Sequence, residues 1–338
     1  MRAPKSVFLP SLAIVALMTA SAVSAQGKKN GNGGGGGGDP PDPVFTPAIA
    51  YLEVGRKSKD LKLSNRAGDA ACLVVSTPLS GARLSGFEFH AAEKVLAYSI
   101  GGQGIFLASW DDDPCTITNV IPIRAGVAPE SMDFSPDGRH LVWRETTEGY
   151  TGFGTAAQIF TYDRSSGLTS EVSLEDWGGV RPEWGVDREW GLFQVHFSPD
   201  FENSNELIFV GGALDGSLGV YQSLFAYDMS EGSPPRKLLD GSGLSFDYVM
   251  SVTNPGGQGE AKVAFTDNDT SNIVQLAIND GGSTVFSGYE PEYSCDNSEI
   301  IHRTGSGRRT EVRITSTDGG ASETWSKADL RFFDWFCP

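Results

Sequence analysis

The sequence is short of the residues that build most metal and redox centres. Its 338 residues include four histidines and four cysteines, and no two cysteines stand in a CxxC spacing. Structural zinc sites and thioredoxin-like sites depend on closely spaced cysteines and histidines. We therefore expect neither kind of site, and we predict no bound cofactor.

Basic residues are also scarce. The chain has 26 lysines and arginines against 43 aspartates and glutamates, which gives a formal net charge of −17. A surface of this charge repels nucleic acids and anionic membranes. It suits cations, basic proteins or neutral glycans, although acidity also simply keeps a protein soluble. We therefore predict no nucleic-acid partner. We also predict a monomeric protein.

A hydrophobic run that resembles a targeting signal occurs only at the N-terminus. Two basic residues precede an apolar stretch from Leu12 to Met18, and Val23-Ser24-Ala25 fits a cleavage site before Gln26. The apolar stretch is too short to cross a bilayer. We predict a secretory signal peptide over residues 1–25, no membrane span, and export to the periplasm, the cell surface or the medium. Loss of the two basic residues of the peptide changes the formal charge to −19.

Glycine, by contrast, is abundant, with 42 residues. Many of them stand in GKKNGNGGGGGGDPPDP, which cannot bury apolar surface and predicts a flexible Gly/Pro-rich linker over residues 26–44. Beyond it, glycine and proline punctuate short runs of β-branched and aromatic residues, a pattern typical of tight turns between strands. We predict one all-β domain over residues 45–338.

The strongest pattern in that domain is an internal repeat. MDFSPDGRHLVW (132–143) and VHFSPDFENSNELIFV (from Val195) each predict a strand, a Ser-Pro-Asp turn and a second strand. QIFTYDRSSG (158–167) and SLFAYDMSEG (223–232) then supply a third strand and a polar turn toward a fourth. Weaker copies along the rest of the chain bring the count to six units of four strands.

The first unit lacks an inner strand, and the chain ends on a strand without a unit. AIAYLEV (48–54) has no strand before it, whereas DLRFFDWFCP (329–338) carries Trp335 where the repeat has Phe134. Cys337 likewise stands in the place of Pro136. The C-terminal strand is therefore predicted to join the first unit and close a ring, which is how β-propellers protect their edges.

FSPDGRHLVW at 134–143 resembles the TolB-like, or WD40-like, propeller repeat, and the other units keep less of it. This resemblance implies a six-bladed β-propeller with four-stranded blades. Relatives with this repeat include a periplasmic protein of the Tol system, propellers that cap prolyl oligopeptidases, and some polysaccharide lyases. TolB has an α/β domain where this chain has its glycine linker, and the sequence has no GxSxG nucleophile elbow. The fold by itself does not choose among these functions.

Three long insertions predict a binding surface. They are Arg144–Ala157, Glu175–Leu192 and Gly211–Gln222, and all three should open on one face of the third and fourth units. The candidate ligand-binding residues in them are Tyr150, Phe153, Trp177, Trp184, Asp187, Arg188, Trp190 and Tyr221. Aromatic rings of this kind bind proteins and stack on sugars. Alternatively, the tryptophans fold the connection down as a local hydrophobic cap.

Three functions therefore stay open. The first is a binding or scaffold protein that holds a protein or glycan partner through those loops. The second is a polysaccharide lyase or other glycan-processing enzyme at the channel mouth, where His90 and His196 could face the channel; we predict no specific catalytic residue. The third is a purely structural envelope protein.

Two acidic segments, 110–113 and 267–269, contain the oxygen ligands that calcium prefers. Aspartate and asparagine are equally ordinary in hairpin turns, and neither segment has the EF-hand pattern. We therefore predict no metal site at either segment, although calcium remains an alternative.

The cysteines predict disulfides, because their number is even and the protein is expected to be exported. Cys295 and Cys337 hold the same repeat position in neighbouring units, so a bridge between them would latch the closure if their Cα atoms lie within reach. Cys72 and Cys115 are also equivalent to one another, but they are expected on outer strands, which diverge.

Overall fold

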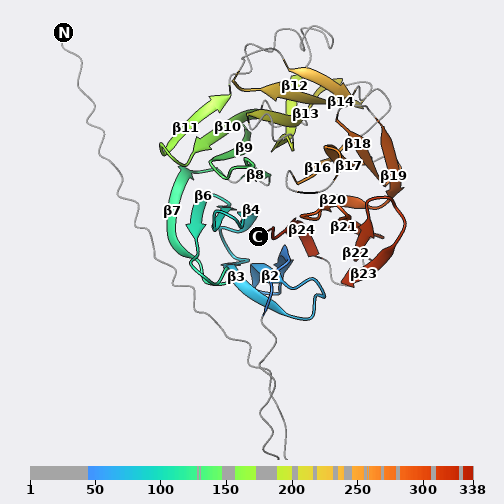
Figure 1. Cartoon of the computed structure of the whole chain (residues 1–338). Helices are drawn as coiled ribbons and strands as arrows, with labels where there is room; N and C mark the ends of the chain where they lie inside the picture. Colours follow the sequence, from blue (N-terminus) through green and yellow to red (C-terminus); the bar gives the residue numbers. More distant parts are fainter. Residues whose placement is uncertain are drawn as a thin grey trace, which may run out of the picture.

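The computed structural model describes residues 45–127, 129, 131–146, 157–172, 189–199, 205–215, 219–230, 235–239, 246–254, 257, 259–267, 270–278, 282–305, 310–326 and 330–337. The predicted signal peptide and linker lie outside these residues. Six four-stranded antiparallel sheets stand around a central axis (Figure 1). This arrangement confirms the predicted six-bladed β-propeller.

Each blade runs from an inner to an outer strand, and blade 1 is completed by the end of the chain. The inner strands of blades 1 to 6 are β24 (Leu330–Trp335), β4 (Leu84–His90), β8 (Met132–Phe134), β12 (Glu189–Phe197), β16 (Phe246–Val252) and β20 (Tyr289–Tyr293). The second strands are β1 (Ile49–Val54), β5 (Val95–Ile100), β9 (His140–Thr146), β13 (Glu206–Asp215), β17 (Lys262–Asp267) and β21 (Glu299–Thr304). The third strands are β2 (Ser58–Ser64), β6 (Gly104–Ser109), β10 (Ala157–Asp163), β14 (Gly219–Asp228), β18 (Asn272–Ala277) and β22 (Glu311–Ser316). The outer strands are β3 (Ala71–Pro78), β7 (Thr118–Ala125), β11 (Leu168–Val172), β15 (Arg236–Leu239), β19 (Ser283–Ser287) and β23 (Ser322–Ser326).

The ring is closed by β24, as the sequence predicts. β24 pairs with β1 in antiparallel register, with Trp335 opposite Ile49 and Phe333 opposite Tyr51. Each inner strand contacts the inner strands of the two neighbouring blades, so that the contacts run around the whole ring. The C-terminus accordingly lies near the centre of the propeller (Figure 1).

The middle strands carry the core because blades cover both of their faces. β5 (VLAYSI) and β17 (KVAFTD) are buried along almost their whole length, whereas β19 alternates between exposed and half-buried residues. A strand that is covered on both faces needs apolar residues in succession, and a strand at an edge does not. Within the part of the chain that the structure describes, no helix is long and apolar enough to cross a membrane.

The turn between the first and second strands of a blade keeps its geometry even where its sequence departs from the repeat. In blade 3 the Ser135 hydroxyl donates to Asp137 Oδ1 at 2.6 Å, and Gly138 adopts a left-handed φ of 65°. In blade 6 the Ser294 hydroxyl donates to Asp296 Oδ1 at 2.8 Å, and Asn297 takes the left-handed position with φ 61°. Asparagine tolerates this conformation better than most residues, so the degenerate copy folds like the intact one.

Candidate functional site

The structure places the two longest connections of the ring at the junction of blades 3 and 4. Ten residues separate β9 from β10, whereas the other connections between second and third strands have three to six residues. Sixteen residues separate β11 from β12, whereas the other connections between blades have one to six. Both connections open on the same end of the propeller, because strands alternate in direction within each blade.

Most candidate binding residues lie in these two connections. Tyr150, Phe153, Trp177, Trp184, Asp187 and Arg188 are outside the described residues. Trp190 lies in β12 and Tyr221 in β14, and both stand opposite Ala213 of β13. The backbone thus brings two of the candidates into one row across blade 4, two strand spacings or about 10 Å apart.

The third predicted insertion, Gly211–Gln222, is a hairpin and not a long loop. β13 continues to Asp215 and β14 starts at Gly219, with an unbroken antiparallel register between them. The two glycines at 211–212 do not end the strand, because beyond them Ala213 pairs with Tyr221 and Leu214 pairs with Val220. The prediction of a loop was wrong here, and blade 4 instead has the longest strands of the ring. Glu189–Leu192 also belong to β12 and not to the preceding connection.

A second group of polar residues lies on the inner strands, and only His196 among them was considered in the sequence analysis. Directly before Trp335, Phe89, Phe134, Phe197, Val252 and Tyr293 of the inner strands, blades 1 to 6 carry Asp334, Glu88, Asp133, His196, Ser251 and Glu292. We call these six residues the channel ring. Alignment of the six units on that single column would have revealed it, since four of the six positions are acidic.

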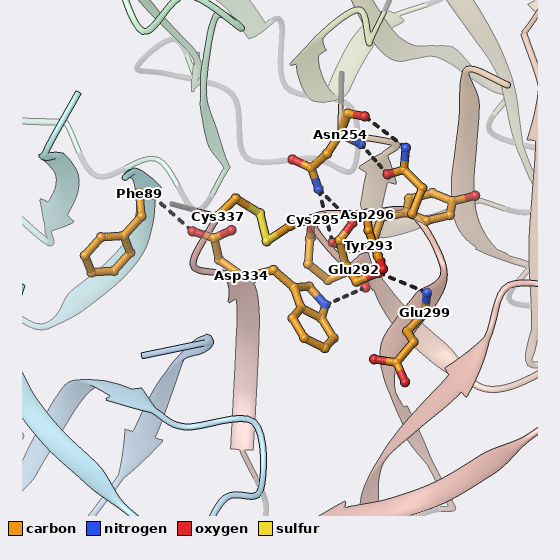
Figure 2. Close-up of a disulfide and its surroundings, with 12 residues drawn as sticks. Phe89, Asn254, Glu292, Tyr293, Cys295, Asp296, Glu299, Asp334 and Cys337 are labelled. Atoms are coloured by element: carbon orange, nitrogen blue, oxygen red, sulfur yellow. Dashed lines mark hydrogen bonds between the residues drawn. A yellow bond between two sulfur atoms is a disulfide. The ribbon is translucent and has the colours of Figure 1, made fainter. Parts of the chain in front are cut away.

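Three side chains of the channel ring form hydrogen bonds to the next blade. Asp334 Oδ2 accepts the backbone N–H of Phe89 at 3.1 Å (Figure 2), and Asp133 Oδ2 accepts that of Phe197 at 2.7 Å. In the same way Ser251 Oγ accepts the backbone N–H of the residue after Glu292 at 3.1 Å. Each of these side chains therefore reaches from its own blade to the inner strand of the next.

Three carboxyl groups of the ring, those of Asp334, Glu88 and Glu292, have pKa values raised toward the protonated form. Burial raises the pKa of Asp334 to about 8, and the nearby charge of Asp133 adds to the effect. Burial also raises the pKa of Glu88 and of Glu292 well above the usual range, again with a contribution from the other ring carboxylates. Desolvation and like charges both disfavour an ionised carboxylate. Around neutral pH the ring therefore holds protons that ordinary carboxyl groups release.

The two histidines that could face the channel differ. His196 belongs to the ring, with its Nδ1 3.4 Å from Asp133 Oδ2. The ring of His90 instead packs edge-on against Phe134, and its Nε2 lies 3.3 Å from the carbonyl oxygen of Pro136. His90 therefore joins blades 2 and 3 and has no place in the channel ring.

The two acidic segments considered for calcium serve as turn caps in the described part of the chain. Asp113 accepts the backbone N–H of Cys115 at 3.0 Å and the hydroxyl of Thr116 at 2.9 Å. Asp267 accepts the hydroxyl of Thr270 at 2.5 Å, while residues 268–269 lie outside the described residues. Among the residues that the structure describes, no group of three or more His, Cys, Asp or Glu side chains is arranged to hold a metal ion.

All four cysteines form disulfides. Cys295 pairs with Cys337 at a Cα–Cα distance of 5.3 Å (Figure 2), within the reach that a bridge requires. Cys72 pairs with Cys115 at 6.0 Å. The expectation that this second pair lies on diverging strands was wrong, because Cys115 stands in the turn before β7 and not in the strand itself.

Comparison with known proteins supports the fold and goes no further. No family model and no curated protein matches the chain. Among solved structures, TolB from Acinetobacter baumannii superposes with a TM-score of 0.62 at 18% identity, over 88% of this chain and 68% of that one. A chain of a nidogen/laminin complex gives a TM-score of 0.59 at 12% identity, over 86% of this chain and 98% of that one. A putative TolB from Agrobacterium tumefaciens gives 0.52 at 14% identity, over 88% of this chain and all of that one.

Proposed function

We propose that this TolB-like propeller is an exported binding protein, which holds a protein or glycan partner at one end of blades 3 and 4. The observation that carries this proposal is the gathering of the ring's two longest connections at one junction. Long connections in a compact repeat fold commonly carry function, because a rigid scaffold positions them. Three tryptophans, Trp177, Trp184 and Trp190, stand within or directly after the longer one.

Two further observations support parts of the proposal. One similar structure comes from a complex of two proteins, nidogen and laminin. The N-terminal segment has the features of a secretory signal, and the two disulfides fit an oxidising compartment outside the cytosol. The glycan-processing alternative has less support, since the six channel-ring positions hold one histidine and no arginine.

The test is capture of partners from an envelope extract and from a glycan panel by the mature protein. The variant is Trp177→Ala/Trp184→Ala/Trp190→Ala. Its matched control removes exposed apolar side chains from outer strands of other blades, as Val120→Ala/Ile121→Ala/Val285→Ala. Loss of aromatic anchors at the centre of an interface typically weakens binding by about tenfold or more.

We expect the tryptophan variant to fold and to lose its partner while the control keeps it. Equal binding by the wild type and a folded tryptophan variant would contradict the proposed site. A second variant replaces residues 173–188 by six Gly/Ser residues, a length that other connections between blades use. Loss of the fold in that variant would favour the local hydrophobic cap over the binding surface.

A further inference from the structure

The closing strand β24 lies at the most heavily charged part of the channel ring. It contacts β20 of blade 6 on one side and β4 of blade 2 on the other, and it pairs with β1. Near the C-terminal end of β24, Asp334 interacts electrostatically with Glu88 from β4, with Glu292 from β20 and, farther round the ring, with Asp133 from β8. From β1 it meets Ala50, which has no charge.

These carboxyl groups make the closure dependent on pH. The pKa of Asp334 in the folded protein is raised to about 8 from an ordinary value of 3.8, so folding favours its protonated form. Its contribution to stability is complete below about pH 4 and is lost as the pH rises through about 8. As the pH rises and these carboxyl groups ionise, Asp334, Glu88 and Glu292 repel one another across the strand that closes the ring.

A covalent bond restrains the same strand. β24 follows β23 of blade 6 after three residues, and just beyond its other end Cys337 is bonded to Cys295 in the first turn of blade 6 (Figure 2). Both ends of the strand are therefore tied to one blade. Without the bridge, the end that carries Asp334 is held only by non-covalent contacts, including the pairing of Ile49 with Trp335.

We propose that the Cys295–Cys337 disulfide is a redox latch: when it is formed, it holds the C-terminal end of β24 against blade 6 despite carboxylate repulsion, and when it is reduced, that end separates from blade 6 and β24 loses its pairing with β1 under alkaline conditions. A dithiol reductant transfers two electrons and two protons to the Cys295–Cys337 bond. The bond becomes two thiols, and the dithiol becomes a cyclic disulfide.

The second disulfide provides a matched control. Cys72 and Cys115 are 43 residues apart in sequence and Cys295 and Cys337 are 42 apart, so the two bridges constrain the unfolded chain almost equally. The control bridge joins the outer strand β3 to the turn before β7 and does not involve β24. Any difference between the two variants therefore reflects what each bridge holds in the folded protein.

The experiment compares hydrogen exchange of the full chain in Cys295→Ser/Cys337→Ser and in Cys72→Ser/Cys115→Ser, each against wild type at the same pH. Comparison at one pH cancels the intrinsic pH dependence of exchange. At pH 9 we expect amides of β24 and β1 to exchange at least tenfold faster in the first variant than in the second. At pH 5 the two variants should agree within twofold.

A rescue variant keeps the test informative if the first variant folds poorly. Asp334→Asn retains a side-chain oxygen for the Phe89 N–H and removes the charge. Added to Cys295→Ser/Cys337→Ser, it should restore slow exchange of β24 and β1 at pH 9. Equal exchange in the two cysteine variants at pH 9, or failure of Asp334→Asn to slow it, would overturn the proposal. The bridge would then be a structural disulfide with no pH-dependent role.

Discussion

The seam between blades 6 and 1 and the junction between blades 3 and 4 use the same repeat position in different ways. Asp334 and Asp133 are equivalent, and each accepts a backbone N–H from the next blade. Asp133 Oδ2 lies 3.4 Å from Nδ1 of His196, whereas Asp334 interacts electrostatically with the carboxyl groups of Glu88 and Glu292. The repeat determines where a side chain stands, and its neighbours determine which interactions it makes.

Further ion pairs and a hydrogen bond join blades 6 and 1, where the ring closes. Arg66 of blade 1 pairs with Glu299 at 2.9 Å and with Glu323 at 2.7 Å, both from blade 6. The indole N–H of Trp335 donates to the carbonyl oxygen of Glu292 at 3.2 Å. Non-covalent and covalent ties thus concentrate where the ring must shut, and the longest connections lie across the ring at blades 3 and 4.

The largest expected effect comes from removal of the aromatic ring that ends the closing strand. Trp335→Ala should lower the free energy of unfolding by about 3–5 kcal/mol, because the side chain is buried and its indole N–H also bonds blade 6. Phe134→Ala is the equivalent change in blade 3 and lacks that hydrogen bond. Urea unfolding of both variants measures the difference, and a Phe134→Ala loss as large as that of Trp335→Ala would remove the distinction between the two regions.

The next effect concerns charge. Asp334→Asn should stabilise the protein at pH 9 by on the order of 2 kcal/mol, because wild type must then ionise a carboxyl whose pKa is raised by burial. At pH 4 the gain should vanish. Asp133→Asn should give a smaller gain at pH 9, since it weakens the short hydrogen bond that Asp133 Oδ2 accepts from the Phe197 N–H at 2.7 Å. Thermal unfolding across this pH range measures both effects. If the stability of the two variants changes with pH in the same way, the proposed difference between the two regions is contradicted.

The smallest effect concerns the ion pairs. Arg66→Ala should cost about 0.5–1 kcal/mol, because its partly exposed guanidinium joins two carboxylates of another blade. Arg139→Ala breaks an exposed pair with Asp163 inside blade 3 and should cost less. Denaturant titration in low and high salt measures both losses. If the loss of stability caused by Arg66→Ala does not become smaller in high salt, the contribution of Arg66 is not electrostatic.

Much of the fold could be predicted because its pattern is local. The turn around Ser135 to Gly138, the apolar middle strands and the position of Trp335 each follow from short stretches of sequence that repeat around the ring. Even the weak copy at Ser294 keeps the turn, since a serine, an aspartate and an asparagine supply the same hydrogen bonds and backbone conformation.

The candidate site on blades 3 and 4 stays a prediction. Loop lengths and tryptophans marked it in the sequence, and the structure adds the row of Trp190, Ala213 and Tyr221. The sequence analysis missed the hairpin of β13 and β14. It took the glycines for loop residues, although their backbones pair with β14 like those of any other residue.

The sequence by itself determined six four-stranded units, their turns and the strand that completes the first unit, because each depends on side chains a few residues apart. Only the tertiary structure decided that Cys72 meets Cys115, and that Glu88, Asp133, Glu292 and Asp334 share one ring. Those facts depend on the distances between residues of different blades, and so do the raised pKa values. Burial and like charges act through space, and only the closed ring brings these groups together.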